Sequence, residues 1–246
     1  MNGSEGDAID DREAAQSAPP YHHVAVVDAW DETPTLRGVR LDLGALAPTY
    51  ARPGQVVKLR AHDCEAYFAL ASAPNADGSG ELLVKRGSPV ADALAAAAPG
   101  TLVEATAPLG DGFPVDAARG RDVLLFAAGA GITPVRALMQ WLLAQRCHGK
   151  LALFYGQRSD RDFAYVREHD GWRADGVHLV LCASQPSPSW TGARGYVQTV
   201  ADELRLHQVG TDNAVAFLCG MRPMVDDVRR VLQQYGLPPE RVFLNV

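Results

Sequence analysis

The chain has few cysteines and no long apolar run, and both absences narrow its class. Its four cysteines, Cys64, Cys147, Cys182 and Cys219, lie far apart and form no C-x-x-C pair. This spacing disfavours a zinc site, an iron–sulfur cluster or a disulfide framework, so we expect no metal. The sequence also lacks a run of about 18 apolar residues and an apolar signal core, and we therefore expect a cytosolic protein without a membrane span.

A concentrated basic surface is missing as well. The formal net charge is −6 and the isoelectric point is near 5.6, with the basic residues scattered along the chain. Nucleic acids and anionic membranes bind clustered positive charge, so we expect neither as a partner. The apolar fraction of 47% is ample for a packed core, and 246 residues suffice for one large domain or two of ordinary size.

The hydrophobic pattern divides the chain into three parts. Residues 1–20 carry almost nothing that could be buried, so we expect a disordered lead. Residues 21–116 contain short β-rich segments separated by proline and glycine, which is typical of a small antiparallel β-barrel. From 121 to 246 strands alternate with helices, which predicts a parallel sheet with helices on both faces. The fold class expected is thus a two-domain chain, a barrel followed by an α/β domain, divided within residues 110–121.

The individual elements follow from the same pattern. In the first domain we expect strands at 23–29, 36–43, 55–60, 67–71, 81–85 and 102–107, with one helix at 89–98. In the second we expect strands at 123–128, 151–155, 177–183 and 214–219, with helices near 134–146, 160–169, 196–206 and 223–235.

The segment from Val123 to Pro134 predicts a buried strand, a glycine turn and a helix start in succession. Gly129 and Gly131 permit sharp turns and close approach of a ligand, Thr133 is a good N-cap residue, and Pro134 suits the first helical position. Free amide groups at such a helix N-terminus bind a diphosphate. Close packing of strand and helix is the other reason for glycines here, and the motif alone leaves both open.

The residues that follow the predicted parallel strands meet at one edge of the sheet, where open α/β folds bind ligands. They are Gly129 to Thr133, Gln157-Arg158, Ser184-Gln185 and Cys219-Gly220-Met221. The third glycine and the acidic ribose-binding residue of ordinary dehydrogenases are both absent. Arg158 and Ser159 instead suit an adenosine 2′-phosphate, although Arg158 could equally be a surface residue on a loop. This edge predicts a nicotinamide dinucleotide site that favours NADPH slightly over NADH.

These motifs resemble those of the ferredoxin–NADP reductase superfamily. Gly129 to Pro134 is similar to its nicotinamide-dinucleotide turn, Leu218 to Met224 to its C-G-x-x-x-M segment, and Trp190 to Gln198 to its G-x-x-G-Y-V stretch. The resemblance extends over about residues 21 to 246 and is greatest to plant and bacterial reductase-like proteins with an F-A-I-A-S flavin motif. It implies FAD on the barrel, NAD(P)H on the second domain, and hydride transfer between them.

The flavin motif departs from the family's R-x-Y-S-x-x-S. Residues Ala66 to Ser72, A-Y-F-A-L-A-S, keep an aromatic residue and the final serine but lack the arginine and the first serine. One charge-assisted hydrogen bond is worth about 1.5 to 3 kcal/mol, so we expect weaker FAD binding, not its loss. Lys85 or Arg86, ahead of Gly87-Ser88 and a helix N-terminus, could supply the missing charge, or could be a solvated strand end.

The resemblance also implies roles for individual residues. Cys219 and Ser72 would line the hydride-transfer site, and Thr133 would place the nicotinamide carboxamide. The other residues implied at FAD are Tyr67, Phe68, Ala69, Leu70, Lys85, Gly87 and Ser88, and those at NAD(P)H are Gly129, Gly131, Ile132, Pro134, Arg158, Ser159, Gly220 and Met224.

Two functions remain open at this point. One is an FAD-dependent NAD(P)H reductase that passes electrons to an unidentified acceptor, such as a separate protein, a small molecule or oxygen. The other is a nucleotide-sensing or subunit-type protein that keeps the fold with weakened turnover.

Overall fold

The computed structural model describes residues 19–61, 63–203 and 212–245. Of the disordered lead expected at residues 1–20, residues 1–18 lie outside the described residues. The same holds for residues 204–206 of the helix expected at 196–206.

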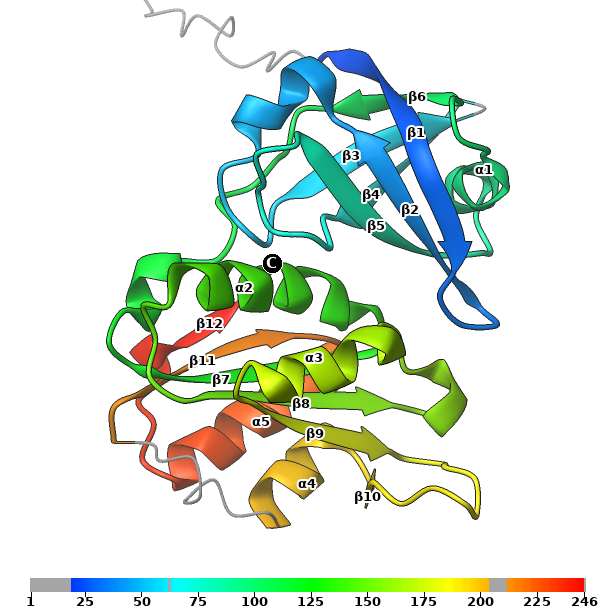
Figure 1. The fold of residues 1–246 in the computed structure, drawn as a ribbon. Coiled ribbons are helices and arrows are strands. Elements are labelled where there is room, and N and C mark those ends of the chain that lie inside the picture. The colour runs from blue at the N-terminus through cyan, green and yellow to red at the C-terminus, as the bar shows by residue number, and fades with distance from the viewer. Residues whose placement is uncertain (1–18, 62, 204–211, 246) are drawn as a thin grey trace, which may run out of the picture.

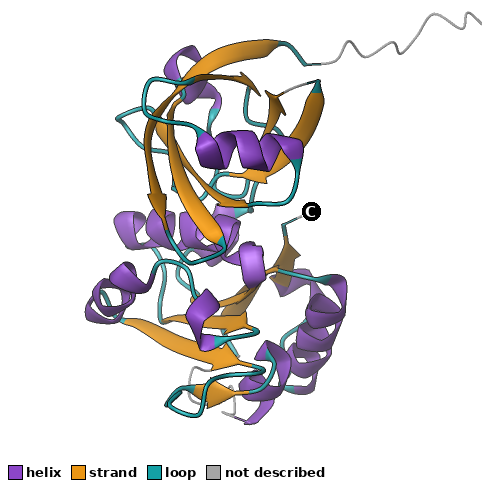
Figure 2. Ribbon diagram, turned by 90° about the vertical axis from the view of Figure 1, so that its right-hand side faces the viewer, coloured by secondary structure: helices purple, strands orange, loops and turns teal. Residues whose placement is uncertain are grey.

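The first domain is a curled antiparallel sheet of six strands, as predicted. Its strands are β1 (Tyr21–Asp31), β2 (Leu36–Asp42), β3 (Val56–Ala61), β4 (Cys64–Ala69), β5 (Ser79–Lys85) and β6 (Leu102–Thr106), in the order β4-β3-β6-β1-β2-β5. The two edges meet where the Ala71 amide donates to the Glu81 carbonyl at 2.7 Å, so the sheet forms a half-barrel. Helix α1 (Pro89–Ala96) packs on the core inside it (Figure 2).

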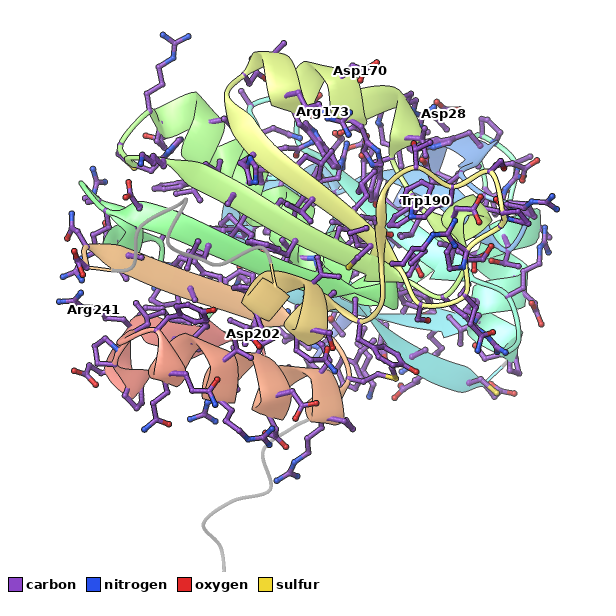
Figure 3. All side chains as sticks on the ribbon, turned by 90° about the horizontal axis from the view of Figure 1, so that it is seen from below. Asp28, Asp170, Arg173, Trp190, Asp202 and Arg241 are labelled. Atoms are coloured by element: carbon purple, nitrogen blue, oxygen red, sulfur yellow. The ribbon has the colours of Figure 1, made fainter. Side chains whose placement is uncertain are left out.

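The second domain is a parallel sheet with helices on both faces, again as predicted. Its strands are β7 (Asp122–Ala128), β8 (Leu151–Gln157), β9 (Val177–Ala183), β10 (Ala193–Arg194), β11 (Ala214–Cys219) and β12 (Val242–Leu244), in the order β10-β9-β8-β7-β11-β12. Helices α2 (Ile132–Gln145) and α3 (His169–Ala174) cover one face, and α4 (Val197–Glu203) and α5 (Arg222–Gln234) cover the other. Figure 3 shows α4 and α5 on the side away from the barrel.

The two domains share an apolar core. Helix α2 lies between the half-barrel and the parallel sheet (Figure 1). The cluster that it forms with β7 and β8 includes Ala71, Leu83 and Phe113 of the first domain, and the Phe113 ring meets Phe217 of β11 edge-on at 5.5 Å. Burial of these groups stabilises the contact between the domains, so the arrangement of a site between them is set by packing.

The helix predicted at 160–169 is wrong. The chain there forms 3₁₀ turns at Asp160–Asp162 and Val166–Glu168, and α3 begins only at His169. Between the turns Tyr165 has a left-handed backbone (φ 61°) and is buried, and the Ala164 amide donates to the Tyr155 hydroxyl at 3.3 Å. A left-handed residue ends a helix, so tertiary contacts overrode the local helical pattern.

Three further observations concern the described residues only. None of their helices combines the length and the apolar character that crossing a bilayer requires. They contain no group of three or more His, Cys, Asp or Glu that could hold a metal ion. The four cysteines are free.

Candidate cofactor site and domain interface

The glycine turn after β7 leads straight into α2. Gly129–Gly131 forms a 3₁₀ turn, Gly131 is the N-cap residue, and the helix begins at Ile132. The predictions that Thr133 caps the helix and that Pro134 is its first residue are therefore wrong by two positions, because the turn itself is already helical in form. Both residues lie buried within the first turn of α2.

Gly129, Gly131 and Gly220 differ in the structural requirement that each one meets. Gly129 has a φ of 58° and open space around it, as a turn that faces a ligand requires. A Cβ at Gly131 would overlap the Cys219 carbonyl oxygen, and one at Gly220 would lie 2.7 Å from the Met224 sulfur. Packing against the end of β11 thus accounts for Gly131, while Gly129 leaves the backbone open to a ligand.

A cavity of about 600 Å³ lies at the carboxyl edge of the parallel sheet. Its walls come from the ends of β7, β8 and β9, the start of α4, and the start of α5 after β11. Its size and its place, where parallel strands end, suit a nucleotide. Of the residues predicted for NAD(P)H, Gly129, Arg158 and Met224 line this cavity.

Arg158 and Ser159 play different parts at the rim. The exposed Arg158 guanidinium donates to the Gln185 side-chain oxygen at 3.0 Å, which holds it over the cavity. The Ser159 hydroxyl instead accepts from the Arg161 amide at 3.3 Å and caps a short turn. Of these two residues, Arg158 lines the cavity and Ser159 caps the turn beside it.

The sequence interpretation missed several residues of this cavity. Tyr196 and Met221 line it and are 64% and 72% exposed, and Gln157 and Gln198 line it too. The signal was available, because Tyr196 and Gln198 belong to the quoted G-Y-V stretch and Gln157 and Met221 follow parallel strands. The motifs predicted no role for these four side chains.

Cys219 ends β11 beside Ala127 of β7 and packs against the cluster on the α2 face of the sheet. Burial raises the pKa of its thiol to about 11. The side chain is therefore a neutral thiol at pH 7, suited to packing rather than to nucleophilic attack.

Ser72 is buried at the edge of the half-barrel that faces α2. Its hydroxyl accepts from the Glu81 amide at 3.0 Å, and its carbonyl accepts from the Tyr50 hydroxyl. These bonds hold the residue in one position and tie its hydroxyl to β5.

The aromatic residues of β4 point to opposite faces. Tyr67 is 63% exposed, with the Lys58 ammonium 5.6 Å from its ring centroid, whereas Phe68 packs on the barrel core. Ala66 packs on that core too, and Leu70 is fully buried. The open aromatic ring of this strand is thus that of Tyr67, although the resemblance gave Phe68 the flavin contact.

Side chains at the start of α1 accept hydrogen bonds from two nearby backbone amides. The Ser88 hydroxyl accepts from the Ala91 amide at 3.3 Å, and the Asp92 carboxylate accepts from the Gly87 amide at 3.0 Å. Lys85 is exposed at the end of β5. Two amide groups that were expected to face a diphosphate are therefore already bonded within the chain.

A buried ionic network joins the domains, and the sequence pattern had not pointed to it. Arg136 of α2 is 5% exposed and donates to both carboxylate oxygens of Glu168, at 2.9 and 2.7 Å. Its Nη1 donates to Glu81 of β5 at 2.8 Å and to the Ala71 carbonyl at 2.7 Å, and its guanidinium lies 4.3 Å from the Tyr165 ring centroid.

Glu81 and Glu32 are carboxylates that the first domain contributes to the interface. Burial by itself would raise the pKa of Glu81, but Arg136 and Arg40 outweigh it and the pKa is lowered. Glu32 accepts from Arg167 at 3.0 Å and from the Tyr165 amide. Both carboxylates thus pair with guanidinium groups of the second domain.

Comparisons with known proteins agree with this geometry. Residues 125–230 match the model of the oxidoreductase NAD-binding domain family. The ferredoxin–NAD(+) reductase component of the alkene monooxygenase system of Xanthobacter autotrophicus is 29% identical over 242 residues, 95% of this chain and 72% of that protein. Over nearly its whole length the chain is thus similar to ferredoxin reductase-like oxidoreductases. The resemblance inferred from the sequence is confirmed.

Two further members of this group extend the comparison. The sulfhydrogenase 1 subunit gamma of Pyrococcus furiosus is 29% identical over 238 residues, 92% of this chain and 80% of that protein. The crystal structure of a ferredoxin NADP⁺ reductase from Neisseria gonorrhoeae with bound FAD and NADP has a TM-score of 0.74 at 15% identity, and covers 91% of this chain and 97% of that one. The two-domain fold class is confirmed.

Proposed function

We propose that this oxidoreductase is an FAD-dependent NAD(P)H reductase, in which hydride passes from the nicotinamide to the flavin and electrons then leave to an acceptor. The observation that carries the proposal is the cavity at the carboxyl edge of the second sheet, beside the open turn at Gly129. The bound FAD and NADP named for the Neisseria structure support the same pair of cofactors here.

The residues of the chain position the cofactors. A bound FAD supplies a group that accepts hydride, so no side-chain acid or base is required. Cys219, as a neutral thiol, would pack against the reacting rings and exclude water from them. Ser72 would contribute the opposite wall, and Thr133, in the first turn of α2, would place the carboxamide.

We infer that FAD is bound non-covalently and weakly. The exposed Tyr67 ring with Lys58 beside it offers a surface for a planar ring. The diphosphate has less to bind, because Ala66 stands where the family has arginine and Ser88 already accepts from the Ala91 amide in the first turn of α1. Lys85 and Arg86 are exposed cations just ahead of that helix, and the Arg86 guanidinium donates to the Ala95 carbonyl at 3.3 Å.

NADPH is the donor that the cavity favours. Arg158 lines it, and its guanidinium suits a phosphate on the adenosine ribose.

The purified protein and its absorption spectrum test the proposal. We expect a yellow protein that releases FAD on denaturation and is bleached on anaerobic addition of NADPH. A colourless protein that binds the dinucleotide but neither binds FAD nor turns over with it would contradict the proposal.

That second outcome would favour a subunit-type or nucleotide-sensing protein. The observation behind this alternative is Ala66 and Ala69 in place of the flavin motif's arginine and serine. The Pyrococcus relative is named a gamma subunit, which is consistent with a protein that functions as one subunit of a larger assembly. Co-purification of a partner protein with the reduced form would identify the electron acceptor in either case.

We also propose domain bounds of 21–116 and 121–246, since the sheets divide between β6 and β7. The cytosolic location stays a prediction from the sequence.

A further inference from the structure

Helix α2 holds the chain on both sides of Ser72. Arg136 and Gln140 lie one turn apart on this helix. The Arg136 guanidinium donates to the Ala71 carbonyl at 2.7 Å, and the Gln140 side-chain oxygen accepts from the Ala73 amide at 3.0 Å. The helix that starts at the dinucleotide turn therefore also holds the segment of the first domain that contains Ser72.

Arg136 is itself fixed from several directions. Glu168 accepts two hydrogen bonds in a bidentate pair, Glu81 accepts a third, and the Tyr165 ring lies against the guanidinium. Arg40 donates to the other oxygen of Glu81 at 2.8 Å, so two guanidiniums face two carboxylates. A planar fork in a buried, charge-balanced site has little freedom to move, and it transmits the position of α2 to its acceptors.

We infer that Arg136 is a positioning residue that sets the separation between the dinucleotide turn and Ser72, and with it the distance over which hydride is transferred. This inference rests on the proposed function. Arg136 acts through the Ala71 carbonyl and through Glu81, whose amide donates to the Ser72 hydroxyl. A misplacement of about 1 Å in such a pair costs about 100-fold in rate, so a small shift here has a large effect.

General adhesion between the domains is the competing explanation, and the molecule contains a matched control for it. Arg167 also crosses the interface and pairs with a buried carboxylate, that of Glu32 in the turn after β1. Figure 1 shows this β1–β2 turn reaching toward the second domain at one side. Arg167→Met removes an interdomain ion pair without touching the segment around Ser72, whereas Arg136→Met removes the contact to Ala71.

The first readout needs no flavin. Hydrogen–deuterium exchange of residues 70–73 in the flavin-free protein should speed up by about 10-fold or more in Arg136→Met, since losing hydrogen bonds frees that segment. Gln140→Met should release mainly the Ala73 amide. Arg167→Met should leave the exchange of residues 70–73 as in the parent.

The second readout is rapid mixing of the FAD-loaded protein with NADPH. Arg136→Met should slow flavin reduction by about 10- to 100-fold with little change in the KM for NADPH, and should weaken the long-wavelength charge-transfer absorbance of the ring pair. Arg136→Lys, which keeps the charge but loses the fork, should recover part of the rate. If Arg136→Met fails to fold, Arg136→Lys and Gln140→Met take its place in both assays.

Two results would overturn the inference. One is unchanged exchange of residues 70–73 in folded Arg136 variants, and the other is an equal loss of reduction rate in Arg167→Met. A parent protein that binds no FAD would instead refute the proposed function, while the exchange comparison would still decide whether Arg136 positions Ser72.

Discussion

The two helices nearest the predicted cofactor diphosphates end differently at their N-termini. Helix α1 is closed by its own residues, with Ser88 as a side-chain cap and Asp92 in the first turn. Helix α2 begins after Gly131, and no side chain of the described residues caps it or places an acidic group in its first turn. Side chains therefore occupy the start of α1, whereas at the start of α2 the Ile132 amide donates to carbonyls of the Gly129–Gly131 turn and the positive end of the helix has no acidic side chain beside it.

We expect this difference to give the two cofactors unequal shares of binding. The turn before α2 lines a cavity at Gly129, so the positive end of this helix should favour the dinucleotide phosphates. The start of α1 should give FAD less, and the flavin should depend more on contacts with its rings. Variants at the two helix starts and at the residues around them test whether this contrast holds.

Gly131→Ala should have the largest effect. The added methyl group would overlap the Cys219 carbonyl, so the turn must move. Overpacking of this kind costs about 1–3 kcal/mol, and a displaced turn should weaken NADPH binding by about 10- to 100-fold. Thermal unfolding and a fluorescence titration measure the two effects. Gly171→Ala, with open space around the new methyl group, is the control, and unimpaired binding in Gly131→Ala would refute the close packing.

Cys219→Ser should slow flavin reduction, by up to about 100-fold, with little change in nicotinamide affinity. Cys219 is the last residue of β11, at the edge that would face the flavin. Serine alters the polarity of this side chain while nearly keeping its size. Because the thiol pKa is about 11, the parent rate should show no step from this group near neutral pH. A rate equal to the parent in a folded, FAD-loaded variant would leave Cys219 as a buried strand-end thiol.

Ala66→Arg should improve FAD retention through gel filtration. It restores the charge that the family pattern has at this position, worth about 1.5–3 kcal/mol or roughly 10- to 100-fold in affinity. The bound fraction is read from the ratio of flavin to protein absorbance. Poorer or equal retention would show that residues 66–72 are not aligned with the flavin motif as assumed.

Arg158→Ala should raise the KM for NADPH by about 10-fold, the worth of one charge-assisted hydrogen bond, and spare NADH. Steady-state rates with both donors measure the split. An equal loss with NADH would mean that Arg158 shapes the cavity through Gln185 and does not bind a 2′-phosphate.

Ser88→Ala should have the smallest effect. Loss of the side-chain cap of α1 costs about 1 kcal/mol of stability, and NADPH binding at the other domain should not change. Denaturant unfolding and the same titration check both statements. A large loss of FAD without a loss of stability would show that Ser88 binds the cofactor. It would contradict the expectation that the start of α1 contributes little to FAD binding.

Most of the fold could be predicted because its signals are local. Strands β9 and β11 have the predicted bounds, and the strands of the half-barrel differ from prediction by a few residues at their ends. Alternating hydrophobicity and turn residues are contained in a few neighbouring positions, so they survive in any tertiary setting. The glycine turn likewise predicted the edge of the sheet where the cavity lies.

Where a distant group competed with a local preference, the sequence alone was insufficient. At residues 160–169, where a helix was expected, the Ala164 amide donates to the Tyr155 hydroxyl and the chain forms 3₁₀ turns instead. Arg136 had no recognisable pattern, because its acceptors lie 32 to 65 residues away. The sequence by itself thus determined the two-domain fold and the edge of the sheet where the cavity lies, which depend on short-range periodicity. Only the tertiary structure decided which side chains meet between the domains, since that depends on groups that packing alone brings together.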